Sequence, residues 1–129
     1  MKPNEPDGLL ALADALREVA GTIRALEAEA REALHVRDDM ATHRKKMQEK
    51  AMVLMDLPDL AHPYIRGLNP SKANKIMKGL KDFSRRAAQA LDLSSIFYLS
   101  SLLYPDDYKE GEKNDLERFI DTIESGLAR

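Results

Sequence analysis

Residues 7–56 read DGLLALADALREVAGTIRALEAEAREALHVRDDMATHRKKMQEKAMVLMD and contain no proline. Taking every third and then fourth residue from Leu9 gives fourteen positions, of which twelve are apolar. This spacing, sustained through the stretch, is typical of a long helix that packs along one stripe. The sequence therefore predicts one helix over 7–56, whose inward stripe is Leu9, Leu12, Leu16, Val19, Ile23, Leu26, Ala30, Ala33, Arg37, Met40, Arg44, Met47, Ala51 and Leu54.

The length of this helix raises the question of what covers it. Fifty residues of unbroken helix reach about 75 Å, whereas a compact domain of this chain length has a radius of gyration of about 14 Å. Either the helix breaks or a second copy covers part of it. The two arginines in the stripe, Arg37 and Arg44, indicate the end of the buried part, a register device or a kink near Asp38 and Asp39.

Self-association is the first partner hypothesis. A two-fold homodimer is the commonest closed oligomer, although a higher homo-oligomer or a different protein partner is also compatible with the stripe. The positions beside the stripe are small and apolar, as at Ala13, Ala15 and Ala20, which favours a bundle helix with two neighbours over an isolated coiled coil. The predicted self-association residues are Leu9, Leu12, Leu16, Val19, Ile23 and Leu26.

The remainder of the chain predicts shorter helices. Residues 57–70 form a connector with three prolines, which leaves room for one or two helical turns around Asp59 to Arg66, and a helix follows over 71–91. The segment 94–104 is apolar nearly all round and predicts a buried helix, with an exposed partner patch as the alternative. A last helix is expected over 112–126. We therefore predict an all-α helical bundle in a single domain, 1–129, built on a long and possibly kinked N-terminal helix, with three or more shorter helices within 71–128.

Composition limits the classes of function. With 33% charged and 43% hydrophobic residues the chain is expected to fold, and no apolar run is long enough for a membrane span or a leader peptide. The absence of cysteine excludes disulfides, thiolate zinc sites and a cysteine nucleophile. No phosphate-binding loop, nucleophile elbow or catalytic triad spacing occurs. We expect a cytoplasmic protein without a membrane partner, and predict no catalytic residue and no cofactor.

A weak metal-site hypothesis concerns the middle of the long stretch. His35, Asp39 and His43 lie at intervals of four, which on one helix would align three potential ligands. Glu32 and His35 also have the Glu-x-x-His spacing of di-iron bundles, but such a site needs a second copy of the motif. The alternative is a solvated strip of polar side chains.

Charge is segregated along the chain, although the net charge is only −2. Residues 62–91 carry seven Lys or Arg against the single acid Asp82, whereas 105–129 are acidic. Basic and acidic helices side by side would explain this. Phosphate binding is the alternative, although aromatic residues for base stacking are few. The predicted basic face is Lys72, Lys75, Lys78, Lys81, Arg85 and Arg86.

Taken together, these patterns predict a non-enzymatic, oligomeric helical-bundle protein that acts as a scaffold, adaptor or regulator through helix–helix contacts. Two alternatives stay open: a nucleic-acid-associated protein that uses the basic face of 71–91, and a metal-binding bundle or enzyme.

Overall fold

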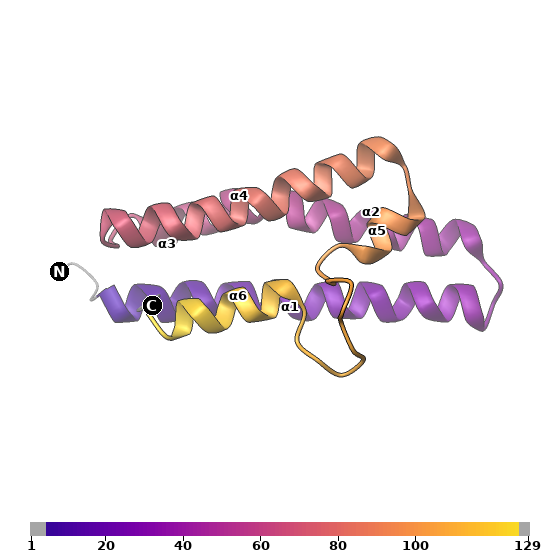
Figure 1. Cartoon of the computed structure of the whole chain (residues 1–129), viewed down its shortest axis with the longest axis horizontal. Helices are drawn as coiled ribbons and strands as arrows, with labels where there is room; N and C mark the ends of the chain where they lie inside the picture. The colour runs from indigo at the N-terminus through magenta and orange to yellow at the C-terminus, as the bar shows by residue number, and fades with distance from the viewer. Residues whose placement is uncertain (1–4, 127–129) are drawn as a thin grey trace.

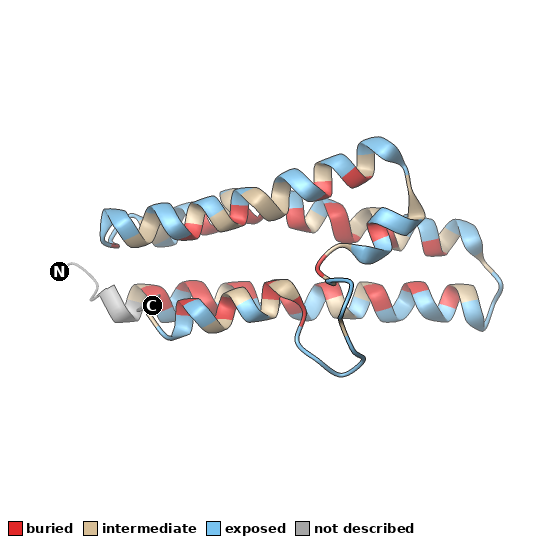
Figure 2. Cartoon of the chain, in the orientation of Figure 1, coloured by how far each residue is buried: buried red, intermediate tan, exposed pale blue. Residues whose placement is uncertain are grey.

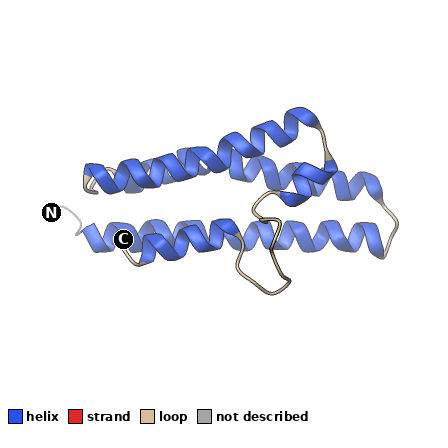
Figure 3. Cartoon of the chain, viewed as in Figure 1, coloured by secondary structure: helices blue, strands red, loops and turns tan. Residues whose placement is uncertain are grey.

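The computed structural model describes residues 5–126, and every regular element in that range is α-helical (Figure 3). The predicted all-α bundle is therefore confirmed. In chain order the elements are α1 (Glu5–His35), α2 (Met40–Met55), α3 (Leu57–Ile65), α4 (Pro70–Leu93), α5 (Ile96–Ser101) and α6 (Asp115–Glu124).

The expected continuous helix over 7–56 is wrong, because the chain reverses direction between α1 and α2. Asp38 adopts a left-handed conformation with φ +50°, which Asp tolerates better than most residues. Asp39 then caps α2: its carboxylate accepts hydrogen bonds from Thr42 N at 3.0 Å and from Thr42 Oγ1 at 2.6 Å. The alternative of a break near Arg37–Asp39 is confirmed, and it turns one long helix into an antiparallel hairpin.

The hairpin of α1 and α2 is the base on which the other helices pack. α1 contacts α2, α3 and α6, and α2 contacts α4 and α5. In Figure 1 the α1–α2 turn projects beyond the end of α4, and Figure 2 shows the buried positions gathered where the helices face one another. The largest buried apolar side chains are Leu12, Leu16, Ile23, Leu54, Leu57, Ile76, Leu80, Leu99, Leu116, Ile120 and Ile123.

The predicted inward stripe holds along α1 and along the C-terminal half of α2. Ala30 and Ala33 are fully buried, as are Ala51 and Leu54. Between these two runs the stripe is open: Arg37 lies exposed in the turn, and the side chains of Met40 and Arg44 are exposed as well. Arg37 and Arg44 therefore mark the region where the chain turns and where other helices no longer cover the stripe.

The C-terminal half departs from prediction at the apolar segment 94–104, and the helical turns allowed in the connector form a helix of nine residues. The connector 57–70 contains a helix, α3, which begins with Pro58 in its first turn, where a missing N–H is harmless. The apolar segment 94–104 was expected to be buried, but only a six-residue helix forms there, and Phe97 and Tyr98 are 74% and 51% exposed. Leu99 is the fully buried residue of α5.

Gly79 leaves room for a side chain of α6, Phe119, to pack against α4. A Cβ atom on Gly79 would lie 2.6 Å from Phe119 Cζ, and the Phe119 ring also makes an edge-to-face contact with Phe83 at 5.7 Å between centroids. The ring of Phe119 therefore occupies the space that a larger residue at 79 would need.

We expect Gly79→Ala to lower the free energy of unfolding by about 1 kcal/mol, because the displaced Phe119 ring outweighs the gain in helix propensity. Gly21→Ala is the matched control, since nothing lies within 4 Å of a Cβ at that helical position. It should raise the free energy of unfolding by about 0.5–1 kcal/mol. Urea denaturation measures both values, and equal stabilisation by the two substitutions would contradict the close packing at Gly79.

Candidate functional site: an exposed aromatic corner on a buried polar network

A buried ion pair joins α1 to α2. The Lys50 side chain is fully buried and Glu27 is 4% exposed, and Lys50 Nζ lies 3.0 Å from Glu27 Oε2. Lys50 Nζ also donates hydrogen bonds to the carbonyl oxygens of Leu99 at 3.2 Å and of Ser100 at 3.4 Å. These carbonyls belong to the last turn of α5, where no helical N–H is available to them. The ammonium group therefore holds the C-terminal end of α5 against the hairpin.

Tyr104 extends this network toward α6. Its hydroxyl donates to Glu27 Oε1 at 2.6 Å and accepts from Arg24 Nη1 at 3.2 Å. Arg24 in turn makes a two-point contact with Glu117, with Nη2–Oε1 at 2.7 Å and Nε–Oε2 at 3.3 Å. Glu117 closes the capping box of α6 with Asn114. One chain of polar contacts thus fixes the segment between α5 and α6 onto α1.

The electrostatics of the network follow from its burial. Desolvation lowers the pKa of Lys50 despite the neighbouring carboxylate of Glu27. Burial and the Glu27 carboxylate raise the pKa of Tyr104. The hydrogen bond from Arg24 lowers the pKa of Glu117. Because the Lys50 side chain is fully enclosed, a substrate has no route to its amine, and the network serves to position backbone and side chains.

The network ends at a surface where large apolar side chains are exposed. We define the aromatic corner as Leu93, Phe97 and Tyr98, which are 63%, 74% and 51% exposed. Phe97 and Tyr98 pack edge to face at 5.4 Å between ring centroids, and Leu93 and Tyr98 line the same hollow. Arg44 of α2 donates to the Ser94 carbonyl oxygen at 3.1 Å, which fixes the α4–α5 junction beside the open part of the α2 stripe. The prediction of a buried helix over 94–104 is wrong for Phe97 and Tyr98, whose exposure instead agrees with the alternative of an exposed patch.

The predicted basic face lies on α4, but its charges are not equivalent. Arg85 and Arg86 both pair with Asp82, Arg86 through Nε at 3.0 Å. Lys75, Lys78 and Lys81 are exposed, and none of them forms an ion pair with an acidic side chain of the described residues. They border a hollow of about 810 Å³ together with Asn74, Met77, Gly79, Asp82 and Arg85.

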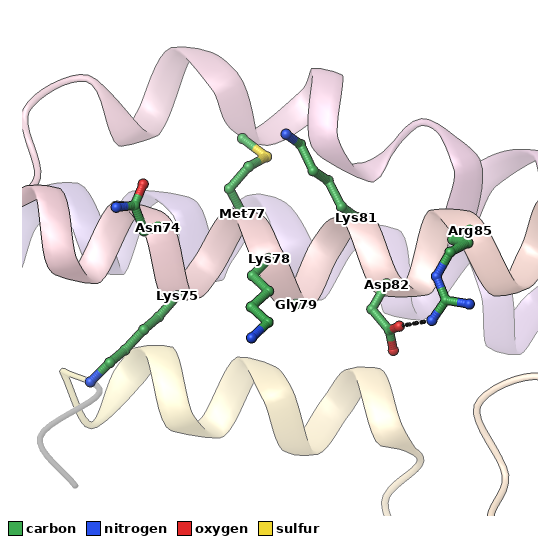
Figure 4. A pocket seen from close by; sticks show the side chains of 8 residues that line it. All are labelled: Asn74, Lys75, Met77, Lys78, Gly79, Lys81, Asp82 and Arg85. Carbon is green, nitrogen blue, oxygen red and sulfur yellow. Dashed lines mark hydrogen bonds and ion pairs between the residues drawn. The ribbon is translucent and has the colours of Figure 1, made fainter.

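The unpaired lysines do not form a single row. In Figure 4 Lys75 and Lys78 point toward α6, and Lys81 points to the other side of α4. Lys72 is half-buried at the start of the helix. The exposed positive charges of α4 that have no ion-pair partner are therefore those of Lys75, Lys78 and Lys81.

The three candidate metal ligands are not brought together. His35 ends α1 and is exposed, Asp39 caps α2, and His43 is buried with Nδ1 2.9 Å from the carbonyl oxygen of Ala30. The expected alignment at intervals of four is wrong because the helix breaks between His35 and Asp39. No group of three potential metal ligands occurs within residues 5–126.

The residues predicted for self-association lie inside a single chain. Leu9, Leu12, Leu16 and Ile23 are at most 5% exposed, and Val19 and Leu26 are half-buried. The break between α1 and α2 and the packing of α3 and α6 supply the cover that a second copy was expected to supply. Self-association stays a prediction, but these side chains are not free to carry it.

Two further findings complete the description of the chain. No helix within the described residues combines the length and apolar character needed to cross a membrane. Comparison with protein-family models, curated proteins and solved structures found no match to this chain. Function must therefore be inferred from its own contacts and exposed surfaces.

We expect Lys50→Met to lower the free energy of unfolding by about 3–5 kcal/mol, because it leaves the buried carboxylate of Glu27 without its cation. The double variant Lys50→Met/Glu27→Met should recover most of this loss, since it removes both charges. Lys46→Met is the control: Lys46 pairs with Glu29 at 2.9 Å on the surface, and its loss should change stability little. Urea denaturation of the four proteins, including wild type, gives the comparison. A double variant as unstable as Lys50→Met would contradict the ion-pair account.

Proposed function

We propose that this chain is a non-enzymatic helical-bundle protein that self-associates, as a homodimer or a higher homo-oligomer, and acts as a scaffold, adaptor or regulator through helix–helix contacts. The observation that supports the proposal is the aromatic corner, where Leu93, Phe97 and Tyr98 are exposed side by side. Clustered exposed apolar side chains of this kind mark interaction sites more often than isolated ones do.

The position of the corner supports a helical contact. The stripe of α2, which is interrupted by the exposed Arg44, ends at Met40, which is 51% exposed. Met40 lies one turn before Arg44 on the same face of α2, and Arg44 is bonded to the backbone at Ser94. The exposed side chain of Met40 on the hairpin thus lies near the aromatic corner. This is the end of the bundle where α4 no longer covers α2. A cytoplasmic location is part of this proposal.

We expect sedimentation velocity to show wild-type protein associating as its concentration is raised from 1 to about 300 µM. Leu93→Asp should weaken this association at least about tenfold, because it places a charge in an apolar contact. Met52→Asp is the matched control, since Met52 is 57% exposed on α2 outside the corner, and it should associate as wild type does. A wild-type protein that stays monomeric over the whole range would contradict the proposal.

A second candidate is nucleic-acid binding through α4, favoured by the unpaired Lys75, Lys78 and Lys81 beside one hollow. The acidic residues of α6, such as Asp121 and Glu124, are paired with Arg17 and would not cancel these lysines directly.

For this second candidate, a labelled DNA duplex should bind at 50 mM salt and lose roughly 40-fold in affinity at 200 mM, as three phosphate contacts imply. Reversing the three lysine charges to Glu should abolish binding, whereas reversing Arg85, already paired with Asp82, should reduce it less. Fluorescence anisotropy measures both effects. Absence of binding at 50 mM salt would remove this candidate.

A further inference from the structure

The aromatic corner combines a projecting side chain with an adjoining hollow. The hollow has a volume of about 400 Å³ and lies between the end of α4, α5, the segment that follows it and the start of α6. Buried Ala90 and Leu103 contribute apolar surface, and Leu93 and Tyr98 of the corner line the same space. The remaining lining residues are Arg86, Gln89, Ser101, Leu102, Tyr104, Pro105 and Asp115.

Phe97 does not fill this hollow in its own chain. It is absent from the lining and is 74% exposed, with its ring edge against Tyr98. A projecting aromatic ring and a hollow with a mostly apolar lining therefore sit next to each other on one surface. A two-fold contact joins the same patch on both copies, so each copy can insert its projection into the other's hollow.

We propose that the hollow receives the Phe97 side chain of a second copy, in a reciprocal two-fold contact. This inference rests on the self-association proposed above and names the side chain that carries it. The available space is sufficient, because an apolar cavity of about 150 Å³ already holds benzene. Aromatic side chains seated in pockets are the usual anchors of protein interfaces.

Charge at the hollow is compatible with a second copy. The hollow carries one cation, Arg86, and one anion, Asp115, and Arg86 is also paired with Asp82. A surface that carries one positive and one negative charge can contact its own copy without net repulsion between like charges. The hollow bordered by the unpaired Lys75, Lys78 and Lys81 would bring like charges together in a two-fold contact. The corner therefore suits self-recognition and the basic hollow does not.

The wall of the hollow is also held in place before any partner arrives. Tyr104 lines it and donates its hydroxyl hydrogen to Glu27 Oε1 at 2.6 Å, and the adjacent turn of α5 is bonded to Lys50. A preformed receptor lowers the entropic cost of association.

The test uses two variants and their mixture. Phe97→Ala removes the projection, and Ser101→Trp places a large side chain at the hollow from an exposed lining position. Each variant alone should self-associate at least about tenfold more weakly than wild type in sedimentation velocity. Circular dichroism should show unchanged helicity, because both positions are exposed.

An equimolar mixture of the two variants should associate more strongly than either alone. The Ser101→Trp chain still carries Phe97, and the Phe97→Ala chain still has an open hollow, so a mixed dimer keeps one of the two reciprocal contacts. A mixture no better than its components overturns the proposal.

The outcomes separate this inference from the proposed function. If wild type associates and Phe97→Ala associates equally well, the insertion of Phe97 is wrong while self-association stands. If wild type stays monomeric, both the proposed self-association and the insertion of Phe97 are wrong. A monomeric wild type that binds the apolar dye anilinonaphthalene sulfonate, with binding blocked by Ser101→Trp, would assign the hollow to a different occupant and also overturn the proposal.

Discussion

The arrangement of this bundle depends on one ammonium group, that of Lys50. It is fully buried, and three acceptors surround it: the carboxylate of Glu27 and the carbonyl oxygens of Leu99 and Ser100. A buried cation is tolerated only when it is paired and hydrogen-bonded. Since these acceptors come from α1 and α5, burying Lys50 requires the hairpin and the short fifth helix to meet in one geometry.

That geometry determines which apolar side chains face water. With the last turn of α5 tied to Lys50, Leu99 is buried and its neighbours Phe97 and Tyr98 lie on the outside. Tyr104 shares Glu27 with Lys50, and through Arg24 the same network reaches Glu117 and α6. Buried polar networks can specify one arrangement where apolar packing alone would allow several. Here the specified arrangement leaves an aromatic pair exposed beside a hollow.

The sequence predicts the class of this fold, offers its turning point only as one of several alternatives, and does not predict its exposed surface. Apolar periodicity identified the buried faces of α1 and of the second half of α2, because those side chains pack at regular helical spacing. The break was signalled by Arg37 and Arg44 in the stripe, yet periodicity cannot say whether a charge ends a helix or faces a partner. The adjacent pair Asp38 and Asp39 was the local cause, one residue left-handed and the next a cap.

The candidate site was misread for a different physical reason. A short apolar run such as 94–104 looks like core, and only tertiary contacts decide which of its faces is covered. Lys50 stands among Met47, Ala51 and Leu54 on an inward face, and this was the available signal of a buried cation. Its partner Glu27 could not be found by spacing, because the pairing depends on the reversal between α1 and α2.

Hydrogen–deuterium exchange at increasing protein concentration tests most directly whether the corner positioned by Lys50 is the surface that meets a second copy. We predict that amides of residues 93–105 become more protected as concentration rises, while the protection of those of 74–82 on the basic face of α4 stays unchanged. Protection that does not depend on concentration, or that grows on α4 or α1 and not at the corner, would contradict it.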